Sequence, residues 1–134
     1  MPRSYPHRLF VYGTLRRGEY NHHVLGNAPL LGLYRTPPHY TMLNLGRYPA
    51  VIAGGRTAIK GEVYALNKAL LARLDSLEHY PEEYLRESIA TPYGSAWIYL
   101  YRHLPTPDTP LITSGDWRLT QHVRPAITPI YHLF

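Results

Sequence analysis

The chain has 134 residues, of which 45% are hydrophobic and 17% charged, and its formal net charge is +5 at pH 7. This length and composition predict one globular domain and exclude a disordered chain. Cysteine is absent, which excludes disulfide bonds and thiolate metal sites. Because the chain has no run of about 18 apolar residues and no apolar signal-peptide stretch, we expect a cytoplasmic protein without a membrane segment.

The first predicted element is a buried strand over residues 9–12, which stops at Gly13 and is followed by Thr14, Leu15, two arginines and Gly18. A glycine that ends a strand can adopt a positive φ and turn successive N–H groups into one concavity, which suits a carboxylate or a phosphate. The spacing matches neither a P-loop nor a dinucleotide-binding fingerprint. Taken alone, the pattern favours an ordinary turn.

The next segments predict short elements joined by turns. Residues 19–27 indicate a short helix, with Asn21 as its cap and Gly26 near its end. Strands are expected over residues 28–36 and 57–66, and two short strands around a loop over residues 37–55. Gly61, inside the strand at 57–66, indicates a bulge or a close approach of two backbones.

Residues 67–81 predict the one substantial helix, spanning roughly Lys68 to Glu78, because Asn67 can cap it and Pro81 prevents much continuation. Its four leucines share one face, and Glu78 projects within that face. Burial disfavours a charged carboxylate, so the pKa of Glu78 should rise, as general acid–base catalysis near neutral pH requires. From the spacing alone, a frayed helix end that lets Glu78 reach water is slightly favoured over this interpretation.

A hairpin is predicted over residues 83–104, with its turn at residues 92–94. Apolar side chains occupy both faces of its second strand, as in a closed or nearly closed sheet. Residues 105–117 are read as a long surface connection, and the course of the tail is not predicted. The fold class is therefore α+β, a small mixed β-barrel of about six strands with flanking helices. The expected core includes Phe10, Val11, Leu31, Val63, Leu70, Leu74, Leu77, Ile89 and Ile98.

Several kinds of site find no support in the sequence. The eight histidines share no ligand spacing and there is no HExxH pattern, so no metal site is predicted. A G-x-S-x-G motif is also missing, and Ser114, which precedes Gly115, is read as part of a structural turn. The basic residues are scattered and form no stripe with exposed aromatic residues, so nucleic-acid binding is only a minor alternative.

Five segments, taken together and in order, resemble the γ-glutamylcyclotransferase-like superfamily, in particular its compact bacterial members and the γ-glutamylamine cyclotransferases. The segments are VYGTLRRGEYNHHVLG, GEVYAL, LDSLEHYPEEYLRE, AWIYLY and SGDW. The resemblance runs from about Leu9 to Trp117. It implies a single domain over residues 1–134 with the family's small β-barrel, an N-terminal extension at 1–8 and a C-terminal tail at 118–134.

The resemblance also implies a site and a reaction. Tyr12, Gly13, Thr14 and Leu15 would bind the glutamyl group, Glu78 would be the catalytic residue, and Tyr84 would form a wall of the pocket. The α-amino nitrogen of a γ-glutamyl compound would attack its own γ-carbonyl carbon, releasing 5-oxoproline and a free amine or amino acid.

No metal and no organic cofactor is implied, and the expected partner is a small γ-glutamyl substrate rather than a nucleic acid or a membrane. The sequence does not specify which γ-glutamyl compound is used, nor the oligomeric state. The alternative is a protein that keeps the same pocket and binds a γ-glutamyl compound or another carboxylate without turning it over.

Overall fold

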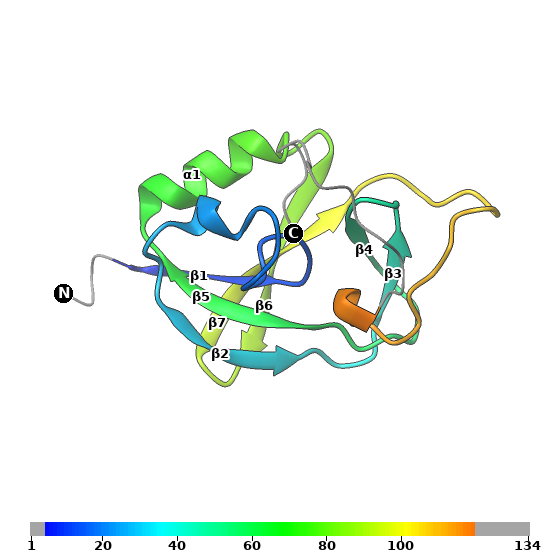
Figure 1. Ribbon diagram of the computed structural model, residues 1–134, viewed down its shortest axis with the longest axis horizontal. Coiled ribbons are helices and arrows are strands. Elements are labelled where there is room, and N and C mark those ends of the chain that lie inside the picture. Colours follow the sequence, from blue (N-terminus) through cyan, green and yellow to red (C-terminus); the bar gives the residue numbers. More distant parts are fainter. Residues whose placement is uncertain (1–4, 120–134) are drawn as a thin grey trace.

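A computed structural model of the chain describes residues 5–119 (Figure 1). In chain order, the elements are β1 (His7–Val11), the 3-10 helix η2 (His22–Leu25), β2 (Leu30–Arg35), β3 (Tyr40–Asn44), β4 (Pro49–Ala53), β5 (Lys60–Leu66), α1 (Lys68–Leu77), β6 (Tyr84–Thr91), β7 (Gly94–Tyr101) and the 3-10 helix η3 (Trp117–Leu119). Most of the predicted tail at 118–134 therefore lies outside the described residues.

The strands form two sheets. The larger sheet has five strands in the order β2-β5-β1-β7-β6, and β3 pairs with β4 in a separate hairpin. The central strand β1 runs antiparallel to β5, with Phe10 opposite Val63, and parallel to β7, with Leu9 opposite Trp97. The expected α+β class is confirmed. The expected closed barrel is not found, because within residues 5–119 no ladder joins the outer strands β2 and β6.

Helix α1 lies along one side of the larger sheet (Figure 1) and agrees with the predicted helix. The side chain of Asn67 accepts a hydrogen bond from the Leu70 N–H group at 2.8 Å, which caps the first turn as expected. Leu71 and Leu74 are buried, whereas Leu70 and Leu77 are partly buried and pack against the core. The apolar face of the helix therefore covers the sheet.

The last turn of α1 is closed by two backbone hydrogen bonds beyond Glu78. The N–H group of His79 donates to the Ser76 carbonyl at 3.2 Å, and that of Tyr80 donates to the Asp75 carbonyl at 3.0 Å. This is the Schellman arrangement, in which the residue after the cap is left-handed. That residue is His79, with φ 54°, in a position that glycine usually occupies.

The predicted core is largely but not wholly correct. Five of its residues are fully buried, namely Phe10, Val11, Val63, Leu74 and Ile98. Ile89 is partly buried, like Leu70 and Leu77. Leu31 is wrongly placed, because its side chain is 38% exposed. It lies on the edge strand β2, and the pairing of β2 with β5 shifts register between Leu30 and Gly32. Such a shift changes which side chains face the core.

Two glycines allow close contacts that a side chain would prevent. A Cβ atom at Gly61 would lie 2.2 Å from the Val11 carbonyl oxygen, so the predicted close approach of backbones is confirmed. A Cβ atom at Gly32 would lie 2.0 Å from the hydroxyl oxygen of Tyr93, in the turn between β6 and β7. That hydroxyl donates a hydrogen bond to the Leu33 carbonyl at 3.0 Å and so joins the turn to the edge strand β2.

The segment after β7 is not entirely a surface connection. Leu111 forms an isolated bridge with Leu43, and Ile112 is buried in the core. Asp116 and Trp117 are also buried, at 5% and 0% exposure. The predicted surface connection is therefore wrong for the last part of residues 105–117. The proline-rich composition indicated exposed residues, but several side chains there are buried.

Candidate active site

Glu78 is the cap residue at the carboxyl end of α1, and its side chain is fully buried. Its N–H group donates to the Leu74 carbonyl at 2.9 Å, so the helix continues to this point. The frayed end that lets Glu78 reach water is therefore not observed. The expectation that the pKa of Glu78 is raised stays a prediction.

Tyr12 follows directly after β1 and lies beside Glu78. Its hydroxyl donates a hydrogen bond to the main-chain oxygen of Tyr99 at 2.8 Å. Burial raises the pKa of Tyr12 well above its usual 10.0, and the charge of Glu78 raises it further, whereas a hydrogen bond with the Val51 main chain lowers it. The main chains of β4 and β7 therefore meet at this hydroxyl, and the carboxyl group at the end of α1 lies within electrostatic reach of it.

Tyr84 begins β6, and its side chain is fully buried. Burial raises the pKa of Tyr84 well above its usual value, and electrostatic interactions with Tyr12 and Glu78 raise it further. The pKa of Tyr99, on β7, is also raised. The main cause is burial, the next is the hydrogen bond to Asp75, and the charge of Glu78 raises this pKa as well. Tyr12, Glu78 and Tyr84, which the resemblance assigned to one site, thus lie within electrostatic reach of one another.

The turn after Tyr12 is tightly closed. The Arg16 N–H group donates to the Gly13 carbonyl at 3.0 Å. Asn21 bonds Thr14 twice, from its N–H group to the carbonyl at 3.0 Å and from its side-chain amide to the hydroxyl at 3.1 Å. Thr14 and Leu15 are fully buried. Within residues 5–119, no hydrogen bond uses the N–H group of Leu15.

Gly13 differs from its expected geometry. The described glycines with positive φ are residues 18, 26, 32, 46, 54, 55, 94 and 115, so the left-handed conformation expected at Gly13 is not found. The turn is shaped instead by the hydrogen bond from Arg16 to Gly13 and by the two bonds from Asn21 to Thr14. The substrate-binding roles of Gly13, Thr14 and Leu15 stay predictions.

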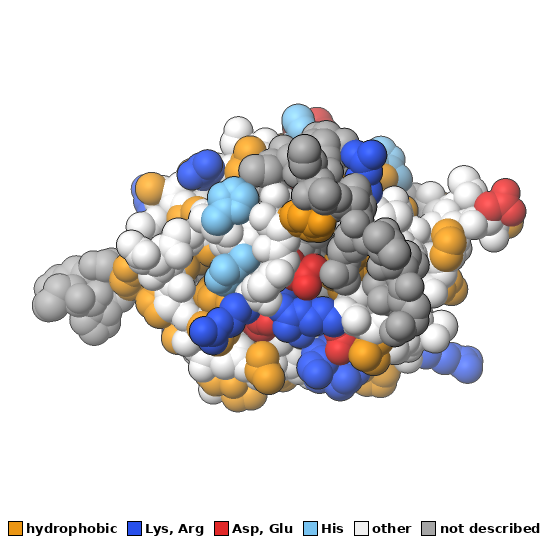
Figure 2. Space-filling model, in the orientation of Figure 1, with side chains coloured by type: hydrophobic (Ala, Val, Ile, Leu, Met, Phe, Trp, Pro, Cys, Tyr) orange, Lys and Arg blue, Asp and Glu red, His pale blue; other side chains and the backbone are white. Residues whose placement is uncertain are grey.

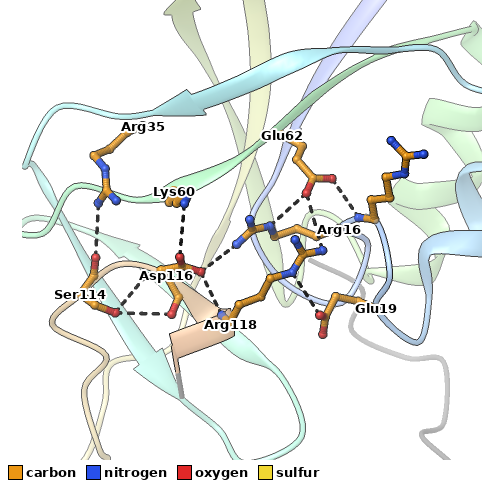
Figure 3. Close-up of polar contacts among 9 residues, drawn as sticks. Arg16, Glu19, Arg35, Lys60, Glu62, Ser114, Asp116 and Arg118 are labelled. Atoms are coloured by element: carbon orange, nitrogen blue, oxygen red, sulfur yellow. Dashed lines mark hydrogen bonds and ion pairs between the residues drawn. The ribbon is translucent and has the colours of Figure 1, made fainter. Parts of the chain in front are cut away.

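A cluster of buried charges lies next to this turn, formed by Arg16, Glu62 and Asp116 (Figure 3). We call these three residues the Arg16 cluster. The Arg16 guanidinium donates from Nε to Glu62 Oε2 at 3.3 Å and from Nη1 to Asp116 Oδ1 at 2.9 Å. All three residues are at most 5% exposed.

Sequence reasoning missed the Arg16 cluster. Its partners come from the turn after β1, from β5 and from the SGDW segment, so no local spacing connects them. The available signal was Glu62 in GEVYAL, a charged residue between apolar neighbours on a strand that pairs on both sides. A charged residue in such a strand is expected to have a partner, although the sequence does not say which.

The exposed charges on the face drawn in Figure 2 have both signs, with acidic and basic side chains intermixed near the lower centre. The described residues contain no group of three histidine or carboxylate side chains placed to hold a metal ion. None of the helices in the described part of the chain is both long and apolar enough to span a membrane.

The comparisons with known proteins agree with the resemblance. Residues 9–119 match the family model described as gamma-glutamyl cyclotransferase, AIG2-like. A Vibrio cholerae protein is 48% identical over 111 residues, which cover 83% of this chain and 95% of that protein. YtfP of Escherichia coli, named as a gamma-glutamylcyclotransferase family protein, is 46% identical over 110 residues, covering 82% of this chain and 95% of YtfP.

Solved structures share the fold. The solution NMR structure of E. coli YtfP superposes with a TM-score of 0.68 at 45% identity, covering 82% of this chain and 95% of that chain. The crystal structure of a mouse AIG2-like protein superposes with a TM-score of 0.65 at 27% identity, covering 82% of this chain and 88% of that chain. The motifs, the fold and these relatives agree, and the chain therefore belongs to the gamma-glutamyl cyclotransferase, AIG2-like family.

Proposed function

We propose that this family member is an active enzyme that releases 5-oxoproline and a free amine or amino acid from a γ-glutamyl compound. The observation that carries the proposal is the position of Glu78, a fully buried carboxyl group whose charge acts on Tyr12, the first residue of the Tyr-Gly-Thr-Leu turn. A buried acidic group beside a turn whose Leu15 N–H group has no acceptor among residues 5–119 suits acid–base chemistry on a bound amide.

The reaction is an intramolecular acyl transfer. The neutral α-amino nitrogen attacks the γ-carbonyl carbon, a new C–N bond closes the five-membered ring, and the bond to the leaving nitrogen then breaks. Because nucleophile and carbonyl belong to one molecule, most of the acceleration comes from holding the folded conformer. Glu78 takes the proton that the attacking nitrogen loses and returns it to the leaving nitrogen, so the enzyme ends unchanged.

The turn after Tyr12 would hold the oxygens of the glutamyl group. The Arg16 N–H group is already bonded to Gly13, so it closes the turn rather than contacting the substrate. The Leu15 N–H group, which has no acceptor within the described residues, is the candidate donor. Main-chain donors fixed in this way lose little conformational freedom when the glutamyl group binds.

The tyrosines around Glu78 would supply neutral walls. Because burial raises the pKa of Tyr12 and Tyr84 well above 10.0, both phenols stay protonated at neutral pH. They therefore place no second negative charge next to the carboxyl group. Tyr84 is proposed as the wall of the pocket. The scheme uses no cofactor, and the cytoplasmic location stays a prediction.

The alternative is a binding protein with the same pocket and no turnover. To separate the two, the wild-type protein is incubated with a γ-glutamyl amino acid, γ-glutamyl-ε-lysine and glutathione, and 5-oxoproline is measured by mass spectrometry. The proposal predicts 5-oxoproline in equal amount with the released amine for at least one compound. If NMR shows that these compounds bind and none yields 5-oxoproline, the binding protein is the correct description.

A further inference from the structure

The Arg16 cluster is bonded directly to the proposed glutamyl-binding turn. Glu62 Oε1 accepts a hydrogen bond from the main-chain N–H of Arg17 at 2.9 Å, and Oε2 accepts from the Arg16 side chain at 3.3 Å. One carboxylate on β5 therefore holds both the backbone and a side chain of the two residues that follow Leu15. The hydroxyl of Tyr64 donates to the same Oε1 atom at 3.0 Å, so the carboxylate itself is fixed in orientation.

The other side of Arg16 is bonded to the SGDW segment (Figure 3). Asp116 Oδ1 accepts from Arg16 at 2.9 Å and also from the N–H group of Arg118 at 3.0 Å. The segment is held against β5 by a hydrogen bond from the Lys60 N–H to the Gly115 carbonyl at 2.9 Å. A Cβ atom at Gly115 would lie 1.8 Å from the Ala58 carbonyl oxygen, so the two backbones are in close contact here.

The charges of the cluster and its neighbours cancel. Arg16 faces two carboxylates, the half-exposed Lys60 lies 3.7 Å from Asp116 Oδ2, and Arg118 lies 3.7 Å from Glu62 Oε2. Glu19, 3.3 Å from Arg118, supplies the third negative charge. Arg16 is therefore committed to protein carboxylates and is not a free cation for the substrate. Burying such charges costs free energy unless each is paired. The buried ion pairs of Arg16 therefore contribute more to a fixed geometry than to stability.

We propose that Glu62 and Arg16 are positioning residues, which fix the peptide planes of residues 14–17 so that the turn presents its main-chain donors to the glutamyl group. This inference rests on the proposed function. An arginine is needed because its planar fork reaches Glu62 and Asp116 at once through different nitrogens, which the point charge of lysine does not do. Glu62 is needed because it accepts from the backbone of Arg17 directly.

The principal test is the Glu62→Gln variant, with Lys60→Met as the matched control. Lys60→Met removes a charge that contacts Asp116 but makes no contact with the turn. Hydrogen exchange of the amides of residues 15–17 is measured by NMR in both. Because hydrogen bonds to charged groups are among the stronger ones, we expect exchange about tenfold or more faster in Glu62→Gln and unchanged in Lys60→Met.

Kinetics provide a readout that a merely structural role would not move. Holding the glutamyl group affects ground state and transition state alike, so KM for the best γ-glutamyl compound should rise about tenfold in Glu62→Gln while kcat changes little. Folding is checked by circular dichroism. A folded Glu62→Gln protein with wild-type exchange at residues 15–17 and wild-type KM would overturn the proposal.

Should Glu62→Gln fail to fold, Arg16→Lys decides the question. This variant keeps the buried positive charge but not the fork, so the proposal expects the same faster exchange and higher KM. Wild-type values in Arg16→Lys would overturn it, because charge alone would then suffice. If wild type turns over no γ-glutamyl compound, the proposed function fails, whereas the exchange data still decide whether Glu62 and Arg16 fix the turn.

Discussion

Arg86 holds the carboxylate of Asp75 at two points, with Nε 2.8 Å from Oδ1 and Nη2 3.0 Å from Oδ2. The guanidinium also lies over the ring of Trp97, 4.4 Å from its centroid. Tyr99 donates to the same Oδ1 atom at 2.6 Å. Because Asp75 precedes Glu78 by three residues, these contacts attach the last turn of α1 to β6 and β7.

Replacing Arg86 by methionine should therefore lower both stability and activity. The side chains of Arg86 and Asp75 are 16% and 20% exposed, so the pair is only weakly screened by solvent. We expect the free energy of unfolding to fall by about 1–3 kcal/mol, as measured by urea denaturation. The control is Arg56→Met, at an exposed arginine. Equal stability of the two variants would show that the pair does not anchor the helix.

Glu78→Gln should remove turnover and keep the fold. The amide has nearly the same shape as the carboxyl group but cannot carry the proton, so kcat should fall by about 10²–10⁴. The unfolding free energy should be unchanged or slightly higher, because an amide avoids the cost of burying an anion. Glu82→Gln makes the same change at an exposed site four residues later. Unaltered 5-oxoproline release in Glu78→Gln would remove Glu78 from the mechanism.

The buried tyrosines predict loss of stability at alkaline pH. Burial raises the pKa of Tyr12 and Tyr84 in the folded state, with Glu78 contributing to both. The unfolded chain releases these protons near pH 10, whereas the folded chain retains them. The resulting stabilisation is fully present below about pH 10 and is lost as the pH rises above it. Urea denaturation between pH 8 and 11 measures this change, in steps of about half a unit.

The same titration tests whether Glu78 lies beside these phenols. In Glu78→Gln one cause of the raised pKa is removed while burial remains, so absorbance at the phenolate band should appear at lower pH than in wild type. Glu82→Gln should titrate as wild type. Coinciding curves for all three proteins would contradict the electrostatic contact described for Tyr12 and Tyr84.

His79→Gly should stabilise the protein. A non-glycine residue in the left-handed conformation is strained, and His79 has φ 54° at the end of α1. Glycine relieves this strain but makes the unfolded chain more flexible, so we expect a net gain of about 0.5–1 kcal/mol in urea denaturation. His39→Gly is the control, since His39 is not among the residues with positive φ. A loss of stability in His79→Gly would mean that the imidazole makes contacts worth more than the strain.

The sequence sufficed where the signal was local. Asn67 and Pro81 mark the limits of α1. The spacing of Glu78 among four leucines slightly favoured a frayed helix end, whereas the structure buries this side chain. Leu31 was placed wrongly because a register shift in β2 depends on pairing with β5, which no local pattern records. The Arg16 cluster was missed for a related reason, since its three residues are 46 and 100 positions apart along the chain. Gly13 was misjudged because hydrogen bonds from Arg16 and Asn21, rather than a left-handed glycine, shape the turn.

The contact between Tyr93 and Leu33 also has a consequence for the edge of the larger sheet. Strand β2 is at the edge of the five-stranded sheet, and Leu31 and Leu33 on it are 38% and 60% exposed. An apolar edge strand is a template on which a second chain can add its own strand. Here the Leu33 carbonyl is already taken by a hydroxyl of the same molecule, in a space that Gly32 leaves open. An incoming strand would have to displace Tyr93 to reach this carbonyl, so we expect the turn between β6 and β7 to hinder pairing of a second chain at Leu33.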